Sequence, residues 1–259
     1  MDFHTSPYID NIGESFNADE FAKVLKDSHV NAIHLTAKCH HGMYYYPTKI
    51  GTMHPSLKFD LFGEQMEACR KKGITRIAHT PVVWNEDLSD RHPEWLQVNM
   101  DGVLGNKSPY YNKYNSVENL GWRYLCLNNR GLVEHTKSEI KEIYDLYKPE
   151  AYWIDIIWQN NCICRMCMKE MRGMGLNPEI LADVVKHDRF VEIRFMKEIY
   201  EYLKELDKKA EVFFNSTTAD YDLADDKELS NQRKSTYMTY IDIESLPTEI
   251  GATATFRYI

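Results

Sequence analysis

The stretch LVEHTKSEIKEIYDLYKPEAYWIDII, residues 132–157, decides the fold that this sequence predicts. Its charged first part has a helical pattern and predicts a helix over 132–147, while its last part predicts a buried strand over 151–157. Asp155 is the one charged residue in that final run. A helix that leads into a short apolar strand is typical of the β-α units that build a parallel sheet.

The same alternation of short apolar runs and longer helical patterns continues in both directions along the chain. Helices are expected over 18–27 and 61–72, where Asn17 and Asp60 are placed to act as N-caps, and again up to about residue 208. Further strands are expected at 2–6, 30–38, 75–81, 211–215 and 240–245. We therefore predict an α/β fold of the (β/α)8 TIM-barrel type, with about six of its eight β-α units present.

Six strands leave such a barrel two units short, and two explanations are open. Either the long loops, above all residues 84–130, contain strands that the pattern does not reveal, or the barrel lacks its last two units. We favour the second explanation because no leftover stretch reads as a buried strand. On this interpretation residues 1–259 form a single, incomplete barrel domain, which associates either with further copies of itself or with a complementing chain.

The amino-acid composition argues against nucleic acids and membranes as binding partners. The chain has 43% hydrophobic residues, enough to fill a core, and its 39 acidic residues outnumber its 31 Lys and Arg to give a net charge of −8. This balance argues against a nucleic-acid surface. No apolar run approaches the length of a membrane span, and the N-terminus does not resemble a secretion signal, so a cytoplasmic protein is expected. Aromatic residues, at 12%, suit a site that presents flat rings to a polar ligand, although a core explains them equally well.

Polar and aromatic side chains gather at the carboxyl ends of the predicted strands. In a parallel barrel these ends face one pit, where the chemistry takes place. Taken singly, each of these residues is more consistent with a helix cap or a satisfied structural group than with a functional role. The set is His4, Lys38, His40, His41, His79, Trp84, Asp155, Trp158, Asn215, Asp242 and Glu244.

Asp155 is the sharpest of these candidates. An unpaired, ionised carboxylate within an apolar run is costly to bury, which indicates that Asp155 has a functional role. Glu244 and Asp242 lie in a similar run further along the chain and share one side of their strand. A nucleophilic carboxylate and a proton-donating one about 5 Å apart are the equipment of a retaining glycosidase. The alternative is a pair of buried salt bridges.

Three segments resemble alpha-L-fucosidases of glycoside hydrolase family 29. Residues 37–42, Ala-Lys-Cys-His-His-Gly, and 46–49, Tyr-Pro-Thr-Lys, are similar to that family's Lys-His-His-Asp-Gly-Phe and Tyr/Trp-Pro-Ser-Lys segments. Residues 147–155 resemble the strand whose aspartate is the family's nucleophile, which implies this role for Asp155. A closer resemblance is to family 151, also called hypothetical glycosyl hydrolase 6. It rests on DFHTS at 2–6, KCHHG at 38–42, YYPTK at 45–49, HPSL at 54–57, HPEW at 92–95 and IESLP at 243–247.

The resemblance implies a retaining glycoside hydrolase that removes terminal alpha-L-fucose without a catalytic cofactor. It implies that His4 and His40 bind the sugar, whereas Cys39 and His41 depart from the family 29 pattern. We assign Glu244 as acid/base from its position at a strand end, with Asp242 in reserve. The expected carbohydrate-binding residues are His4, His40, His41, Trp84, Trp158 and Asn215.

Two alternative functions stay open. A beta-galactosidase-like barrel would usually carry an Asn-Glu pair on the fourth strand, where this sequence has Asp155-Ile156. The other alternative is a non-catalytic fragment or sugar-binding remnant, since a barrel without two units loses part of its pocket wall.

Three cysteines lie close together directly after the fourth predicted strand. Cys162, Cys164 and Cys167 are spaced to bind a soft cation but need a fourth ligand for tetrahedral closure. Cys126 is the natural candidate, and the four cysteines resemble the structural zinc site of family 42 beta-galactosidases. Such a closed site would fix a loop and take no part in catalysis. The alternative is a reduced cluster without metal.

Overall fold

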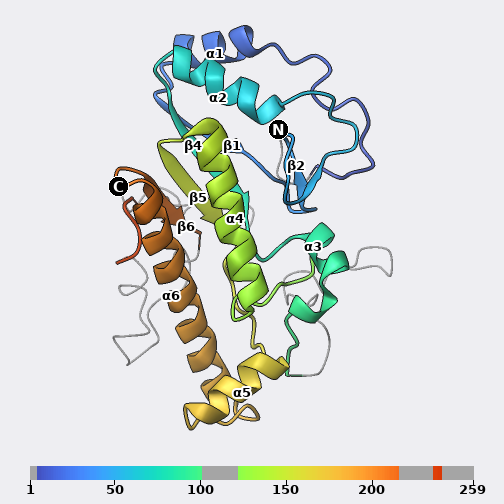
Figure 1. Ribbon diagram of the computed structural model, residues 1–259, viewed down its shortest axis with the longest axis vertical. Helices are drawn as coiled ribbons and strands as arrows, with labels where there is room; N and C mark the ends of the chain where they lie inside the picture. The colour runs from blue at the N-terminus through green and yellow to red at the C-terminus, as the bar shows by residue number, and fades with distance from the viewer. Residues whose placement is uncertain (1–4, 101–121, 216–235, 241–259) are drawn as a thin grey trace, which may run out of the picture.

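A parallel sheet forms the centre of the molecule (Figure 1). The computed structural model describes residues 5–100, 122–215 and 236–240. Its main sheet has the order β1-β4-β5-β6, and all neighbouring strands are parallel. The chain visits the four strands in their spatial order with helices between them, which is the winding of a barrel wall and confirms the predicted fold class. The sheet does not close into a complete barrel within the described ranges. The strands are β1 (Ala32–Thr36), β4 (Thr75–Pro81), β5 (Ala151–Asp155) and β6 (Glu211–Phe214).

The long helices agree closely with the sequence pattern. Asn17 accepts a hydrogen bond from the Glu20 backbone at the start of the first helix, and Asp60 accepts one from Gly63 at the start of the second, so both predicted caps are confirmed. Two further long helices run along the sheet beside each other (Figure 1). These helices are α1 (Ala18–Asp27), α2 (Leu61–Lys71), α4 (Arg130–Tyr147) and α6 (Leu181–Leu206).

Several short elements were not predicted. The small helices α3 (Glu86–Arg91), η1 (Pro93–Trp95) and α5 (Arg165–Gly173) lie within the insertions. A second, two-stranded parallel sheet joins β2 (Met43–Tyr44) to β3 (Thr52–Met53). Elements this short show no periodicity, so the sequence pattern carries no signal for them.

Some predicted strands differ from the structure. Thr5 and Ser6, the described part of the predicted strand at 2–6, do not lie in a strand. The strand predicted for 151–157 ends at Asp155, because Ile156 has a φ of +50° and cannot continue an extended conformation. The strand predicted for 240–245 lies outside the described residues beyond Tyr240.

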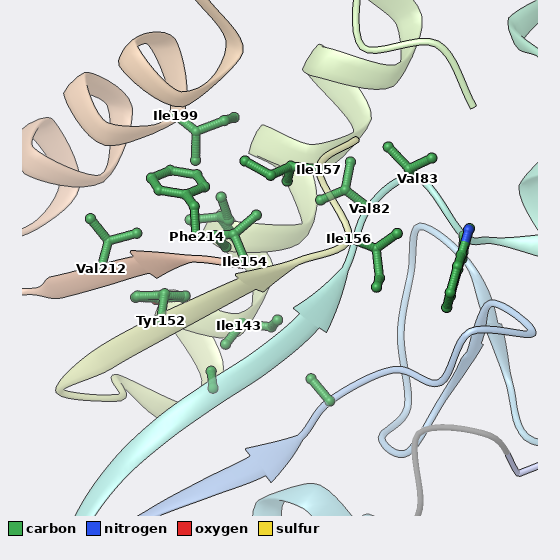
Figure 2. Close-up of a cluster of buried hydrophobic side chains, with 14 of the residues drawn as sticks. Val82, Val83, Ile143, Tyr152, Ile154, Ile156, Ile157, Ile199, Val212 and Phe214 are labelled. Carbon is green, nitrogen blue, oxygen red and sulfur yellow. The ribbon is translucent and has the colours of Figure 1, made fainter. Parts of the chain in front are cut away.

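The two faces of the sheet have different characters. On the outer face, Tyr152, Ile154, Val212 and Phe214 pack with Ile143 of α4 and Ile199 of α6 in the main hydrophobic core (Figure 2). Because side chains alternate along a strand, the intervening residues point to the inner face of the arc. That face carries Asp155 and the rings of His34, His79, Trp153 and Phe213, and the other three rings contact Trp153. The inner face is thus where a polar site can form. No helix in the described part of the chain is long and apolar enough to cross a membrane.

Candidate active site

Asp155 lies at the carboxyl end of β5 and is held by three hydrogen bonds. Its Oδ2 lies 3.0 Å from Nε2 of His79, and its Oδ1 accepts hydrogen bonds from Nδ2 of Asn215 at 2.7 Å and from the backbone N–H of Ile156 at 2.9 Å. Asp155 is 4% exposed. Three neighbouring segments of the sheet therefore fix one buried carboxylate in a single orientation.

The surroundings keep this carboxylate ionised. Burial would by itself raise the pKa of Asp155, but the hydrogen bond and charge interaction with His79 outweigh it, assisted by His40 and Asn215. The pKa of Asp155 therefore lies below its ordinary value. An ionised carboxylate at neutral pH is the state that a nucleophile requires.

The residue after Asp155 is held in an unusual conformation. Ile156 is β-branched, and a φ of +50° is strained for such a residue. Its N–H donates to Asp155, and its carbonyl accepts from the Val83 N–H at 2.9 Å. These two bonds stabilise the turn, and the turn supplies the backbone donor that fixes Oδ1.

The histidine segment 38–42 is held by the start of α3. The Glu86 and Asp87 N–H groups donate to the carbonyls of His40 and His41 at 3.4 and 3.1 Å. Gly42 adopts a φ of +84°, and a Cβ at this position would lie 2.1 Å from the side-chain oxygen of Asn85. Only glycine permits this close approach, so the final residue of the motif has a structural role.

Aromatic rings line the carboxyl end of the sheet beside these histidines. Trp84 stacks on Trp122 with ring centroids 5.8 Å apart, and it meets Trp158 edge-on at 5.6 Å. His40 lies 5.1 Å from Trp84, and His41 lies 4.7 Å from Trp122. Flat rings with polar edges suit a sugar, which has apolar C–H faces and hydroxyl rims.

The structure brings most of the described candidates to one end of the sheet. Asp155 and Asn215 are in direct contact, and the rings of His40, His41, Trp84 and Trp158 form the adjoining cluster with Trp122. The remaining candidates, His4, Asp242 and Glu244, lie outside the described residues.

Two residues at this end were not chosen from the sequence. The sequence places His79 at a strand end without indicating a role. The strand register indicates one, because Pro81 pairs with Asp155 and His79 lies two residues earlier on the same face. Trp122 lies near the end of the long insertion, two residues before Tyr124, and Tyr124 forms an isolated antiparallel β-bridge with Trp84. No pattern in a single sequence predicts that pairing.

Lys38, another strand-end residue, lies on the helix side of the sheet. Its Nζ forms an ion pair with Oε2 of Glu139 on α4 at 2.6 Å, with both side chains almost completely buried. Tyr44 and Thr80 donate hydrogen bonds to the same carboxylate. The lysine therefore joins β1 to α4 and does not reach the inner face.

The four predicted cysteines form one compact group between the 126 segment and α5. Their sulfur atoms all lie within 4.8 Å of one another, and Cys126 Sγ is 3.6 to 3.9 Å from the other three. Tetrahedral Zn²⁺ with Zn–S bonds of about 2.3 Å places its sulfurs about 3.8 Å apart. The donor set and its spacing therefore fit a structural zinc ion.

Comparison with one known structure supports the fold, and two others are similar to a lesser degree. The alpha-L-fucosidase isoenzyme 2 from Paenibacillus thiaminolyticus is similar with a TM-score of 0.81 and 29% identity, over 96% of this chain and 35% of that one. An alpha-L-fucosidase of glycoside hydrolase family 29 from Bacteroides thetaiotaomicron gives a TM-score of 0.46 and 18% identity, over 76% and 33% of the two chains. The Thermotoga maritima alpha-fucosidase in complex with fucose gives 0.42 and 15%, over 76% and 35%. The chain spans about a third of the length of the Paenibacillus enzyme.

A protein-family model matches more than half of the chain. No curated protein matches the chain. The model of the family described as hypothetical glycosyl hydrolase 6 matches residues 17–156, which include the helix-strand stretch up to Asp155 and make up more than half of the sequence. The chain therefore belongs to the hypothetical glycosyl hydrolase 6 family.

Proposed function

We propose that this chain is a retaining glycoside hydrolase that removes terminal alpha-L-fucose, with Asp155 as its nucleophile. The observation that carries the proposal is the geometry of Asp155, a buried carboxylate held ionised at the carboxyl end of a barrel strand beside a cluster of aromatic rings. Family membership and the similarity to the Paenibacillus alpha-L-fucosidase support both the reaction class and the sugar.

In this proposal Asp155 attacks the anomeric carbon through Oδ2. Oδ1 already accepts two hydrogen bonds, which occupy both of its lone pairs, whereas His79 leaves one lone pair on Oδ2. As the Oδ2–carbon bond forms, the bond to the departing oxygen breaks, and that oxygen takes a proton from the acid/base. The same group then deprotonates the water that displaces Asp155, so the anomeric configuration is retained. A retaining mechanism requires the two carboxyl groups to be about 5 to 5.5 Å apart. We assign the acid/base to Glu244, with Asp242 as the alternative.

The residues around Asp155 supply contacts for a carbohydrate. We propose that His4, His40, His41 and Asn215 hydrogen-bond to sugar hydroxyls. Trp84 and Trp158 would cover an apolar face of the ring, and Trp122 extends this surface.

We propose a structural zinc ion, and no catalytic cofactor, for the second cluster. Cys126, Cys162, Cys164 and Cys167 would hold the ion as thiolates in a closed tetrahedron, which leaves no position for a water molecule. The ion would join the segment before α4 to the loop after β5 and stabilise both.

Hydrolysis of p-nitrophenyl glycosides tests the reaction. We expect release of nitrophenol from the alpha-L-fucoside and not from the beta-galactoside, and loss of this activity by at least about a thousandfold in Asp155→Gly, since a covalent step is removed. Azide should partly restore turnover in Asp155→Gly by replacing the carboxylate as nucleophile. Asp145→Asn, at an exposed position of α4, is the control and should behave as wild type.

The outcomes separate the alternatives. Proton NMR of the first-formed sugar should show the alpha anomer, whereas the beta anomer would rule out retention. Preferred cleavage of the galactoside would favour the galactosidase alternative. Fucose binding without any hydrolysis would favour the sugar-binding alternative, and equal activity in Asp155→Gly would refute the role of Asp155.

A further inference from the structure

Gln159 connects the four-cysteine cluster to the loop that follows the candidate nucleophile. It lies directly after Trp158 and is 6% exposed. Its Nε2 lies 3.1 Å from the sulfur of Cys126 and 3.5 Å from that of Cys167, so it donates toward both, and its Oε1 accepts from the Leu127 N–H at 3.0 Å. One side chain thus touches two of the four sulfur atoms and the segment that carries one of them.

The loop has a second anchor that does not touch the cysteines. Gln97, 1% exposed, donates from Nε2 to the carbonyl of Trp158 at 2.9 Å and accepts from the Asn160 N–H at 2.8 Å. The Gln159 N–H also donates to Glu192 of α6 at 2.9 Å. Residues 158–160 are therefore held between two buried glutamines, of which one contacts the sulfur cluster.

The loop leads from the cluster to the sugar site within a few residues. The Trp158 ring packs against Trp84, and Trp84 packs against His40 of the histidine segment. A shift at Gln159 is passed directly along the chain to Trp158. Packed side chains and hydrogen bonds of this kind are what carries coupling between two sites.

We infer that Gln159 is a positioning residue that couples metal occupancy of the four-cysteine cluster to the placement of Trp158 in the sugar site. Sulfur that is bound to a metal as thiolate accepts stronger hydrogen bonds than a neutral thiol does, so the contacts from Nε2 are firm with the metal bound and weak without it. The inference rests on the proposed zinc site, and its link to catalysis rests on the proposed function.

Fluorine NMR of the chain labelled with fluorotryptophan tests the coupling without using activity. The chain has five tryptophans, and the Trp158 resonance is identified by its loss in Trp158→Phe. We expect this resonance to move when a chelator removes zinc from the wild type. In Gln159→Leu at saturating zinc it should stay at the metal-free position, and Gln159→Glu, which keeps an acceptor for Leu127, should show the same effect.

Two matched variants separate the contacts. Asn128 donates to Cys167 Sγ at 3.5 Å without touching residues 158–160, so Asn128→Leu should weaken zinc affinity about 10-fold or more while Trp158 still responds to the metal. Gln97→Leu should displace the Trp158 resonance whether or not zinc is bound. Zinc affinity is measured in each case by competition with a chromophoric chelator, and folding by circular dichroism.

Each outcome has one meaning. The coupling is overturned if wild-type Trp158 does not respond to zinc, if Gln159→Leu responds as wild type does, or if the wild type takes up no zinc. With fucoside as substrate, we expect Gln159→Leu to raise KM about tenfold with a smaller change in kcat, as for loss of a binding surface. An inactive wild type with the NMR result intact would refute the proposed function and leave the coupling in place.

Discussion

The ion pair between Lys38 and Glu139 gives a sharp test of how the histidine segment is attached to the barrel. The two charges lie 2.6 Å apart, and the side chains are 3% and 2% exposed. In Glu139→Gln the lysine keeps its charge and its burial but loses its counter-charge. Breaking a buried pair from one side costs about 3 to 5 kcal/mol, because the remaining charge is uncompensated. For a chain of this size that corresponds to a fall in Tm of about 6 to 20 °C.

The double variant Lys38→Met/Glu139→Gln separates lost charge from lost packing. The glutamine oxygen can still accept one of the hydrogen bonds that Tyr44 and Thr80 donate to the two Glu139 oxygens, and its amide nitrogen can donate to the other hydroxyl. The methionine fills the space of the lysine stem. We expect the double variant to recover most of the stability, because replacing both charges of a buried pair is often close to neutral. Urea denaturation at pH 7, followed by circular dichroism, measures all the variants. A loss below about 1 kcal/mol in Glu139→Gln would refute the reasoning, since that is the range of hydrated surface pairs.

The same pair predicts a pH dependence. Burial would raise the pKa of Glu139, but Lys38 and His135 outweigh it and hold the pKa below its ordinary value. A carboxyl group with a lowered folded-state pKa stabilises the protein above the unfolded-state pKa, about 4.3, and loses this contribution as the pH falls through the folded-state value. The wild type should lose stability over this acid range more steeply than Glu139→Gln does. Equal slopes would contradict the assignment.

Two further predictions concern contacts of the site and its support. Replacing His79 by Phe removes the donor 3.0 Å from Asp155, so the acid limb of the kcat/KM profile should move to higher pH and kcat/KM should fall about 10- to 100-fold. His79→Gln should show a smaller shift of the acid limb and a smaller fall in kcat/KM. An acid limb that does not move in His79→Phe would contradict this prediction. Glu142 accepts hydrogen bonds from Tyr46, Thr48 and the Lys49 N–H at 2.6 to 3.0 Å. Glu142→Ala should therefore lower the free energy of unfolding, measured by urea denaturation, by about 1 to 3 kcal/mol, whereas Asp145→Ala on the same helix should change it little. Equal effects of the two substitutions would show that the contacts of Glu142 do not stabilise the fold.

The long elements of the fold could be predicted from the sequence because each carries its own local signal. The first helix begins and ends where predicted, at Ala18 and Asp27, since Asn17 caps it and an apolar stripe faces the core. The strand at Thr75–Pro81 also has its predicted bounds, because its residues form an uninterrupted buried run after Thr75. The small sheet of β2 and β3 has no such signal, because its pairing depends on contacts across the intervening loop.

The candidate site was predictable only in part, since strand ends show which residues converge but not how they touch. The position of Asp155 followed from a lone carboxylate in an apolar strand. Its contact with His79 depends on the register of two strands, and Trp122 reaches the site through an irregular segment. The cysteine group was predictable beyond its local triplet only by resemblance, because Cys126 lies 36 residues from Cys162.

The helix-strand stretch that specifies the sheet also places the histidine segment. Glu139 of α4 holds Lys38 and Tyr44, and three residues later Glu142 holds residues 46–49. Residues 38–49, which begin with the histidine segment, are therefore tied at both ends to one face of one helix. Carboxylates at i and i+3 lie on the same helix face, which matches the course of a short chain segment running along it. Since α4 leads directly into β5 and Asp155, the distance between His40 and Asp155 is set by the docking of one helix on one sheet. A change that tilts α4 would therefore separate the candidate nucleophile from His40 and His41 while leaving every strand, and the contact with His79, in register.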